Sequence, residues 1–407
     1  MRVAHIAYQY GMNNTGGAAI ASTRLHQALL AHGVESHYIC VHAREAGENV
    51  HEMPHGWKRK VFLSLTKTLR CIWKFAPYRK SICLNLIPMF GLEKLLNKVK
   101  PDIVHIHWLN ADVASFEQLK HLPYKCVFNL HDLFIINAIA PYPFSDTRFI
   151  TGFNRQNSGF LEQFLFARKR KMIERLNASF IGPSEWVCNQ CRQSIIGRGR
   201  ISDAIPNCVD MSFIEQRAMN DAIQGSKFVI IFGSYGGRHN HTKGFSDLVI
   251  CLEKLPPTIK AQCELRIFGE QAQSCFIGGI ATNFLGHIDD KSIMIKELRK
   301  AHVFAFPSIA ETQGMVKVEA MLCGVPVIAF DRTACAEGIE QGVSGWIAND
   351  GDHNEFAVGI LRYFELWRAG KWDKVREMVR RHAYRTFNPN RIVEKVIDAY
   401  NDKINSN

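Results

Sequence analysis

The segment from Phe306 to Pro326 constrains the fold more than any other part of this chain. The short apolar run Val303–Phe306 is closed by a proline and a serine, as at the end of a strand. Met315–Leu322 has helix-forming composition and ends at Cys323-Gly324, with a proline just beyond. A strand, a tight loop, a helix and a second strand in this order predict a parallel α/β sheet.

Two glutamates stand eight positions apart in this segment, Glu311 in the loop and Glu319 inside the helix. The loop end of a helix carries unpaired backbone N–H groups and a partial positive charge, which suit a diphosphate. Carboxylates on either side of that position can accept hydrogen bonds from hydroxyl groups. The arrangement therefore suits a sugar nucleotide, with sugar hydroxyls at one end and ribose hydroxyls at the other.

The segment resembles the Glu-x7-Glu motif of retaining glycosyltransferases with the GT-B fold, in particular those of family 4. The resemblance implies that Glu311 and the backbone after it hold the transferred sugar and its phosphate, and that Glu319 holds the ribose. Two surface glutamates in an ordinary α/β loop are the alternative, and the flanking Pro-Ser and Glu-Ala-Met-Leu-Cys-Gly-Val-Pro residues favour the motif. The donor-binding residues implied are Thr312, Gln313, Gly314, Met315 and Glu319.

Length and composition predict two domains. The chain has 407 residues, 47% of them hydrophobic, which is enough for two cores, and its 22% of charged residues excludes a disordered protein. Strands alternate with helices from Val3 onward, and the pattern restarts at Phe228. The resemblance implies a GT-B fold, two Rossmann-like parallel-sheet domains that face each other across a cleft. We expect an acceptor domain over 1–206, a linker over 207–226, a nucleotide-sugar donor domain over 227–386 and a last helix, 388–407, that crosses back to the first domain.

The cysteines indicate a reducing compartment. Twelve are scattered singly through apolar segments, a spacing typical of buried thiols in a cytosolic protein and not of a disulfide framework. Cys188 and Cys191 form a lone CxxC, which we interpret as two helix residues instead of a zinc site. The N-terminus opens with a strand instead of a secretory signal, and no apolar stretch approaches the roughly 20 residues that span a bilayer. We therefore expect a soluble or peripheral protein.

The net charge of +12 is concentrated in one segment. Residues 57–100 contain eleven lysines and arginines against one acid, Glu93, and large apolar residues recur between them at helical spacing from Trp57 to Trp73. A basic amphipathic helix with tryptophans suits an anionic membrane surface. The alternative is a helix that packs its apolar face inside the domain. Nucleic acid is a weaker interpretation, because no nucleic-acid-binding motif accompanies the charge.

Gly16 and Gly17 follow the first strand and open a helix. Their spacing does not match G-x-G-x-x-G, and the chain contains no Gly-x4-Gly-Lys-Ser/Thr phosphate loop. Glycines at this place let the backbone approach a phosphate or sugar, although a plain strand-to-helix turn explains them too. The resemblance implies a Gly-Gly loop that faces the donor phosphate and the acceptor. The continuation Gly-Gly-Ala-Ala-x-Ala-x-x-Arg-Leu-His resembles family members that build bacterial surface polysaccharides.

Two cations follow the strand that opens the second domain. In this family a Gly-Arg and a Lys-Gly pair neutralise the donor phosphates, and Arg238 and Lys243 have about that mutual spacing. Here residues 234–237 intervene between the strand and the arginine, a departure from the family pattern. The resemblance implies an electrostatic role for both cations as the diphosphate departs.

Histidines cluster after two strands of the first domain. His105 and His107 alternate along one strand and share a face; we interpret them as core or supporting residues, with no third metal ligand nearby. His131-Asp132 follows the strand at Lys125–Leu130, at the end where α/β sheets bind ligands. The resemblance implies that His131 contacts the donor sugar and that Asp132 orients its neighbours.

These observations predict a retaining glycosyltransferase that moves a sugar from a UDP- or GDP-linked donor to a saccharide or lipid-linked acceptor. We expect no cofactor, no metal and no nucleic-acid partner. We place the protein in the cytoplasm, peripheral at the inner face of the cell membrane, in bacterial surface polysaccharide synthesis. Two alternatives are a nucleotide-sugar epimerase or phosphorylase on the same fold, and a non-catalytic peripheral membrane scaffold.

Overall fold

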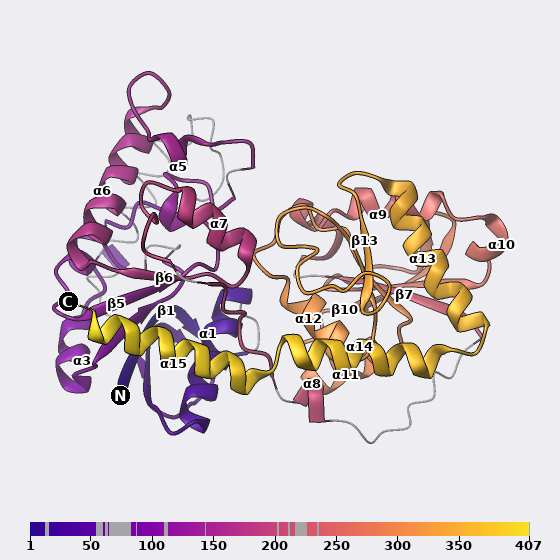
Figure 1. Ribbon diagram of the computed structural model, residues 1–407, viewed down its shortest axis with the longest axis horizontal. Coiled ribbons are helices and arrows are strands. Elements are labelled where there is room, and N and C mark those ends of the chain that lie inside the picture. Colours follow the sequence, from indigo (N-terminus) through magenta and orange to yellow (C-terminus); the bar gives the residue numbers. More distant parts are fainter. Residues whose placement is uncertain are drawn as a thin grey trace. The chain divides into compact units, whose positions relative to one another are not determined.

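The chain divides into two compact units, which are coloured by sequence in Figure 1. The first unit comprises Met1–Cys208 and Ile392–Asn407, and the second comprises Val209–Arg391. The computed structural model describes residues 1–12, 16–53, 60–61, 64, 83–86, 88–109, 113–142, 144–201, 203–210, 212–215, 226–233 and 236–406. Within these ranges no helix combines the length and the apolar character needed to cross a bilayer.

The first unit is built on a six-stranded sheet in the order β3-β2-β1-β4-β5-β6, with every neighbouring pair parallel. This is the strand order of the Rossmann fold, in which the chain reverses direction across the sheet between β1 and β4. Its strands are β1 (Arg2–Tyr10), β2 (Glu35–Ala43), β3 (Val50–Glu52), β4 (Ile103–Ile106), β5 (Lys125–Asn129) and β6 (Ser179–Ile181).

Helices cover both faces of this sheet because its strands are apolar on both sides. On one face, α1 (Gly17–Ala31) and α15 (Pro389–Asn405) pack against Val3, Ile103 and Val127. Figure 1 shows α15, in yellow, lying beside the strands of the first unit. The other face is covered by α3 (Leu92–Val99), α4 (Phe116–Lys120), α6 (Phe160–Leu176) and α7 (Glu185–Gln193).

The second unit contains a seven-stranded sheet in the order β13-β12-β11-β7-β8-β10-β9, parallel except for β9. The chain starts at the centre with β7 and then extends to either side, so β7 and β11 form the point where the strand order reverses. The strands are β7 (Phe228–Gly233), β8 (Cys263–Phe268), β9 (Cys275–Ile277), β10 (Ile280–Gly286), β11 (Val303–Phe306), β12 (Val327–Phe330) and β13 (Gly345–Ala348). The helices are α8 (Ser212–Glu215), α9 (Phe245–Glu253), α10 (Pro257–Lys260), α11 (Lys291–Arg299), α12 (Met315–Leu322), α13 (His353–Arg368) and α14 (Trp372–Thr386).

The predicted strand Val303–Phe306 and helix Met315–Leu322 are confirmed with the same bounds. The short strands β3, β9 and β13 were not predicted.

Most of the basic segment, residues 57–100, lies outside the described residues. Its described end, α3, buries Leu92, Leu96 and Val99 in the first core, so this part packs within the unit. The CxxC cysteines lie buried on α7, as expected for helix residues.

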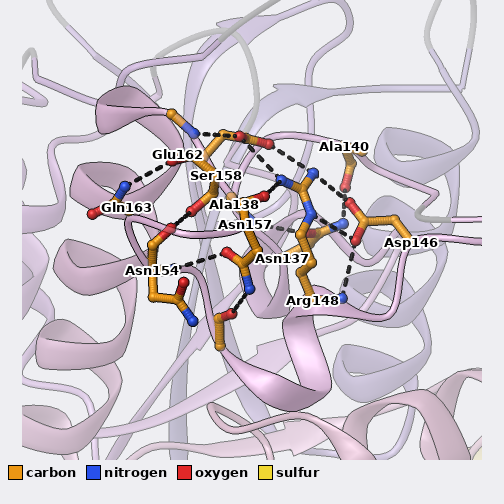
Figure 2. A network of polar contacts seen from close by, with 12 residues as sticks. Asn137, Ala138, Ala140, Asp146, Arg148, Asn154, Asn157, Ser158, Glu162 and Gln163 are labelled. Carbon is orange, nitrogen blue, oxygen red and sulfur yellow. Dashed lines mark hydrogen bonds and ion pairs between the residues drawn. The ribbon is translucent and has the colours of Figure 1, made fainter.

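Arg148 organises the segment that leads into α6, as Figure 2 shows. It begins α5 (Arg148–Thr151), and its Nη2 donates to Asp146 Oδ2 at 2.8 Å and to Glu162 Oε1 at 2.9 Å. Its Nη1 donates to the carbonyl of Asn157 at 2.8 Å. One side chain thus ties the loop before α5 to the first turn of α6.

Replacement of this arginine should destabilise the first unit. In Arg148→Gln the carboxylate of Glu162, only 9% exposed, loses its charged donor, and we expect a loss of about 1–3 kcal/mol in the free energy of unfolding. Arg170→Gln is the control, because Arg170 pairs with Glu174 in an exposed ion pair that contributes about 0.5 kcal/mol or less. Urea unfolding of both variants measures the difference, and equal losses would contradict this role of Arg148.

Candidate functional site

Two loops at the carboxyl ends of β7 and β11 carry the charged residues predicted from the sequence. β7 and β11 are neighbouring parallel strands, and the strand order reverses between them. In doubly wound sheets, ligands bind where strand order reverses, outside the carboxyl ends of the strands. The loop after β7 contains Arg238 and Lys243, and the loop after β11 contains Glu311.

Gly244 lets these two loops approach closely. It has a positive φ of 68°, and a Cβ built on it would lie 2.0 Å from the carbonyl oxygen of Pro307. The Ile309 N–H then donates to the Thr242 carbonyl at 2.8 Å, a backbone link between the loops. Only glycine fits at position 244, so the Lys-Gly pair of the sequence has a steric cause.

Lys243 and Glu311 meet as a result of this approach. Lys243 Nζ donates to Glu311 Oε1 at 2.5 Å, with the lysine side chain 25% exposed and the glutamate side chain 9% exposed. The Glu311 backbone N–H donates to Thr333 Oγ1 at 3.0 Å, which anchors it to the loop after β12. Two residues that lie 68 positions apart in the sequence therefore form one ion pair.

The helix α12 begins beside this ion pair. Gly314 precedes it in the left-handed conformation, with φ of 77°, and a Cβ there would lie 2.5 Å from the Phe306 ring. Thr312 and Gln313 are buried, Met315 is half-buried, and Glu319 is buried on the helix itself. The first turn carries no acidic side chain. Its N–H groups, which lack partners within the helix, are therefore not opposed by a negative charge there.

Lys317 supports the site and was missed by the sequence analysis. Its buried Nζ donates to the carbonyls of Ala334, Cys335 and Glu337 at 2.9, 3.0 and 2.7 Å. Burial lowers the pKa of Lys317 to about 8. Lys317 thus ties α12 to the same loop that anchors Glu311. A lysine between the apolar residues Val316 and Val318 was the available signal.

Arg238 pairs with Glu270, a second residue that the sequence analysis missed. Arg238 Nη2 donates to Glu270 Oε1 at 2.6 Å, and its backbone N–H donates to Oε2 at 3.0 Å. The arginine lowers the pKa of Glu270 to about 2. Its guanidinium also lies 4.7 Å from the centre of the Phe284 ring. The structure thus brings Lys243 to Glu311 and Arg238 to the adjacent loop after β8.

In the first unit, Gly16 and Gly17 lie at the start of α1, the first helix after β1. Gly16 caps the helix with an extended backbone, φ of −77°, and a Cβ on either glycine would meet no atom within 4 Å. Neither glycine is therefore required by packing within the described residues. This contrasts with Gly244 and Gly314, and it leaves room for a ligand to approach the backbone.

His131 lines a small pocket at the carboxyl ends of β4 and β5. Its Nε2 lies 3.0 Å from His107 Nδ1, and Asn129 Nδ2 lies 3.1 Å from the same nitrogen. Asp132 accepts from Trp108 Nε1 at 2.8 Å and from the Phe134 N–H at 2.9 Å, so it orients its neighbours as expected. The pocket is lined by Ala21, Leu25, His107, Asn129, His131, Ile181, Ile205, Pro206, Asn207, Cys208 and Val396.

The expectation that no third histidine lies near His105 and His107 was wrong. His5 on β1 pairs in register with His105 on β4, and the three residues each bring one ring nitrogen within 4.8 Å of the others. All three are buried. Sequence reasoning missed His5 because strand pairing joins residues 100 positions apart. The residue types fit a metal such as zinc, although His5 and His107 already share a hydrogen bond of 2.9 Å.

Two doubly wound sheets, with charged or glycine-rich loops at the carboxyl ends of their strands, place the chain among two-domain α/β proteins that bind ligands at those ends. A family model described as Glycosyltransferase Family 4 matches residues 15–213, and one described as Glycosyl transferases group 1 matches residues 229–365. The chain therefore belongs to the glycosyltransferases, with a family 4 domain followed by a group 1 domain.

Relatives include phosphatidyl-myo-inositol mannosyltransferase of Mycolicibacterium smegmatis, 30% identical over 47% of this chain and 54% of the relative. A 41.2 kDa protein of the cps region of Klebsiella pneumoniae is 26% identical over 46% and 49%. The chain thus spans about half the length of these two relatives. Escherichia coli WcaC, named for a glycosyl transferase of colanic acid biosynthesis, is 24% identical over 80% of this chain and 83% of the relative.

Solved structures share the fold. Sucrose-phosphate synthase from Thermosynechococcus elongatus aligns with a TM-score of 0.67 at 18% identity, over 98% of each chain. Anabaena Alr3699/HepE, in complex with UDP-glucose, aligns with a TM-score of 0.66 at 16% identity, over 99% of this chain and all of that one. These likenesses confirm the GT-B fold.

The buried histidines predict that the first unit is the more sensitive to acid. Burial lowers the pKa of His105 to about 3 and that of His26 to about 4, from an ordinary value of 6.5. The unfolded chain therefore takes up protons as the pH falls below 6.5, whereas the folded chain does not. As the pH falls from 7 to 5, the free energy of unfolding should therefore decrease by about 2 kcal/mol for each of these histidines.

Limited proteolysis at pH 7 and pH 5, with the fragments identified by mass spectrometry, tests this sensitivity. Cleavage should increase first in the first unit. The described part of the second unit has one histidine with a comparable shift, His302, whose pKa burial lowers to about 3. Equal protection of the two units at pH 5 would contradict the prediction.

Proposed function

We propose that this chain is a retaining glycosyltransferase that moves a sugar from a UDP- or GDP-linked donor to a saccharide or lipid-linked saccharide. The observation that carries the proposal is the ion pair of Lys243 and Glu311 beside the amino end of α12. A cation, a buried carboxylate and helix N–H groups at one point suit a diphosphate joined to a polyhydroxylated sugar.

In the proposed reaction the bond between the sugar carbon and the donor phosphate breaks, and a bond to the acceptor oxygen forms on the same face of the sugar. The acceptor hydroxyl passes its proton to the departing phosphate oxygen, so atoms and charge balance without a protein nucleophile. Lys243 and the start of α12 stabilise the negative charge that develops on the diphosphate. Glu311 accepts hydrogen bonds from sugar hydroxyls, and Glu319 accepts them from the ribose.

The remaining predicted residues support these roles. The amides of Thr312, Gln313, Gly314 and Met315 contact the sugar and phosphate. Arg238 is assigned to the donor phosphates, with Glu270 holding its guanidinium in place. In the first unit, a Cβ on Gly16 or Gly17 would meet no described residue within 4 Å, which suits close approach of a phosphate, and His131 is assigned to the donor sugar. No resident cofactor or metal is part of this proposal.

We further propose that the enzyme acts in bacterial surface polysaccharide synthesis, in the cytoplasm, at the inner face of the cell membrane. WcaC and the Klebsiella relative are named for a polysaccharide pathway or a cps region, which supports the pathway. Eleven cations against one acid in residues 57–100 support contact with anionic lipid. That segment lies mostly outside the described residues, so the proposed membrane contact is supported by the charge of the segment alone.

Loss of the Lys243 cation should lower both activity and stability, because Glu311, whose side chain is 9% exposed, also loses its charged donor. In Lys243→Met we expect kcat/KM for sugar transfer to fall about 100-fold or more, because one preformed charge on the leaving group is removed. Lys291→Met is the matched control, since Lys291 forms an ion pair of 2.6 Å with Asp210 elsewhere in the second unit. Similar activities of the two variants would contradict the assignment.

The substrate itself can be identified with a panel of UDP- and GDP-sugars. Calorimetric titration of the wild-type chain, repeated with Glu319→Ala, should show one donor class that binds and a marked loss in the variant. Products formed from that donor without acceptor separate the alternatives, because slow hydrolysis favours a transferase and net epimerised donor an epimerase. Unaltered binding by Glu319→Ala would contradict the ribose role.

Gly16 offers a test in the first unit. A Cβ at this position would meet no atom of the described residues within 4 Å, and threonine is about as favourable as glycine at a helix N-cap, so Gly16→Thr should leave the unfolding temperature nearly unchanged. If a phosphate or sugar approaches the backbone here, the same change should lower kcat/KM about tenfold or more by blocking that approach. Wild-type activity in a stably folded Gly16→Thr protein would show that the loop is only a strand-to-helix turn.

A further inference from the structure

Three histidines of the first unit form a hydrogen-bonded row that leads away from the pocket. His131 Nε2 lies 3.0 Å from His107 Nδ1, and His107 Nε2 lies 2.9 Å from His5 Nδ1. The ring centres are 5.2 Å apart at both links. Parallel strand pairing produces the row, because His5 lies on β1 and the other two follow the adjacent strands β4 and β5.

The two ends of the row differ. At the outer end, His131 and His107 line the pocket together with Asn129 and Asn207. At the inner end, His5 is fully buried, and its Nε2 has no hydrogen-bond partner among the described residues. Among the residues that the structure describes, no acceptor therefore lies within hydrogen-bonding distance beyond His5. The row can hold protons in place, but it offers no path through the sheet.

Proton counting couples the three rings. Burial lowers the pKa values of His5, His107 and His131, so each ring is neutral and carries one proton near pH 7. A neutral imidazole donates from one nitrogen and accepts at the other. Both hydrogen bonds of the row can form only if every ring carries its proton on the side facing His5, or every ring carries it on the side facing the pocket. Reversal of one ring alone would set two lone pairs or two N–H groups against each other.

We propose that His107 and His5 are positioning residues that fix the tautomer and the orientation of His131. The inference rests on the proposed function, in which His131 contacts the donor sugar. His131 Nε2 lies 3.0 Å from His107 Nδ1, and Asn129 Nδ2 lies 3.1 Å from His131 Nε2 and 3.3 Å from His131 Nδ1. The tautomer therefore decides whether Nδ1 donates to or accepts from a sugar hydroxyl that replaces the Asn129 amide there. His5 thus influences the pocket from two links away.

A metal held by His5, His105 and His107 is the competing explanation of this cluster. A cation there would displace the proton shared by His5 and His107. His105 Nδ1 is also already bound to the Tyr400 hydroxyl at 2.6 Å. Three neutral, fully buried ligands would leave a double positive charge in the core, which is costly. Zinc analysis of the purified chain decides the point, and one tightly held zinc per chain would overturn the proposal.

The tautomer of His131 can be measured directly by NMR of protein labelled with ¹⁵N-histidine. Its signals are assigned by their loss in His131→Gln. We expect one neutral tautomer in the wild-type chain and a reversed or mixed tautomer in His5→Phe. His105→Phe is the matched control, because His105 is equally buried beside His5 but is bonded to Tyr400 and not to His131. An unchanged tautomer in His5→Phe, or the same change in His105→Phe, would overturn the proposal.

A second pair of variants separates positioning from packing. In His107→Asn the amide lies where Nδ1 was and keeps the link to His131, whereas in His107→Gln it lies where Nε2 was and keeps only the link to His5. We expect kcat to fall about tenfold or more in His107→Gln with the donor KM little changed, and to be partly restored in His107→Asn. Equal losses in equally stable proteins would overturn the proposal. If His131→Gln itself leaves transfer unaltered, the proposed role of His131 fails, whereas the tautomer measurement still decides the coupling.

Discussion

The close approach of Gly244 to the carbonyl of Pro307 is the contact on which the candidate donor site depends. Any side chain at position 244 would overlap that oxygen, and the positive φ also favours glycine. Because the backbones meet there, Lys243 reaches Glu311 at 2.5 Å. The order of the strands determines where this site lies, since β7 and β11 are the strands between which the order reverses. The chemistry proposed for the chain thus follows from a steric fit between two backbone segments.

A third loop holds the motif rigid. Thr333 accepts from the Glu311 backbone, and the buried Lys317 donates to three carbonyls of residues 334–337. The motif residues Glu311 and Glu319 are therefore set in place by groups that themselves touch no ligand in the proposed reaction. Preformed charges of this kind need little reorganisation when charge develops on a leaving group. In the first unit, the proposed histidine row would orient His131 in a comparable way. There the hydrogen bonds between imidazole rings would take the place of those that Lys317 donates in the second unit.

Local signals predicted much of the fold and of the site, and pairing between distant segments explains what was missed. The bounds of Val303–Phe306 and Met315–Leu322 were predicted because proline and glycine mark them in the sequence itself. Gly244 and Lys243 came from a family motif, whereas the steric reason for the glycine needed the structure. His5 and Glu270 were missed because their partners, His107 and Arg238, follow neighbouring strands of the sheet and lie 102 and 32 positions away in the sequence. Short edge strands such as β3 and β9 were missed because three residues give too little pattern.

The most direct test of the account is a structure of the chain bound to the donor nucleotide selected by the UDP- and GDP-sugar panel. The account predicts the diphosphate within hydrogen-bonding distance of Lys243 Nζ and of the backbone N–H groups that begin α12, with the ribose hydroxyls on Glu319. A nucleotide bound elsewhere, or bound here with Glu311 and Glu319 turned away from it, would contradict the central claim.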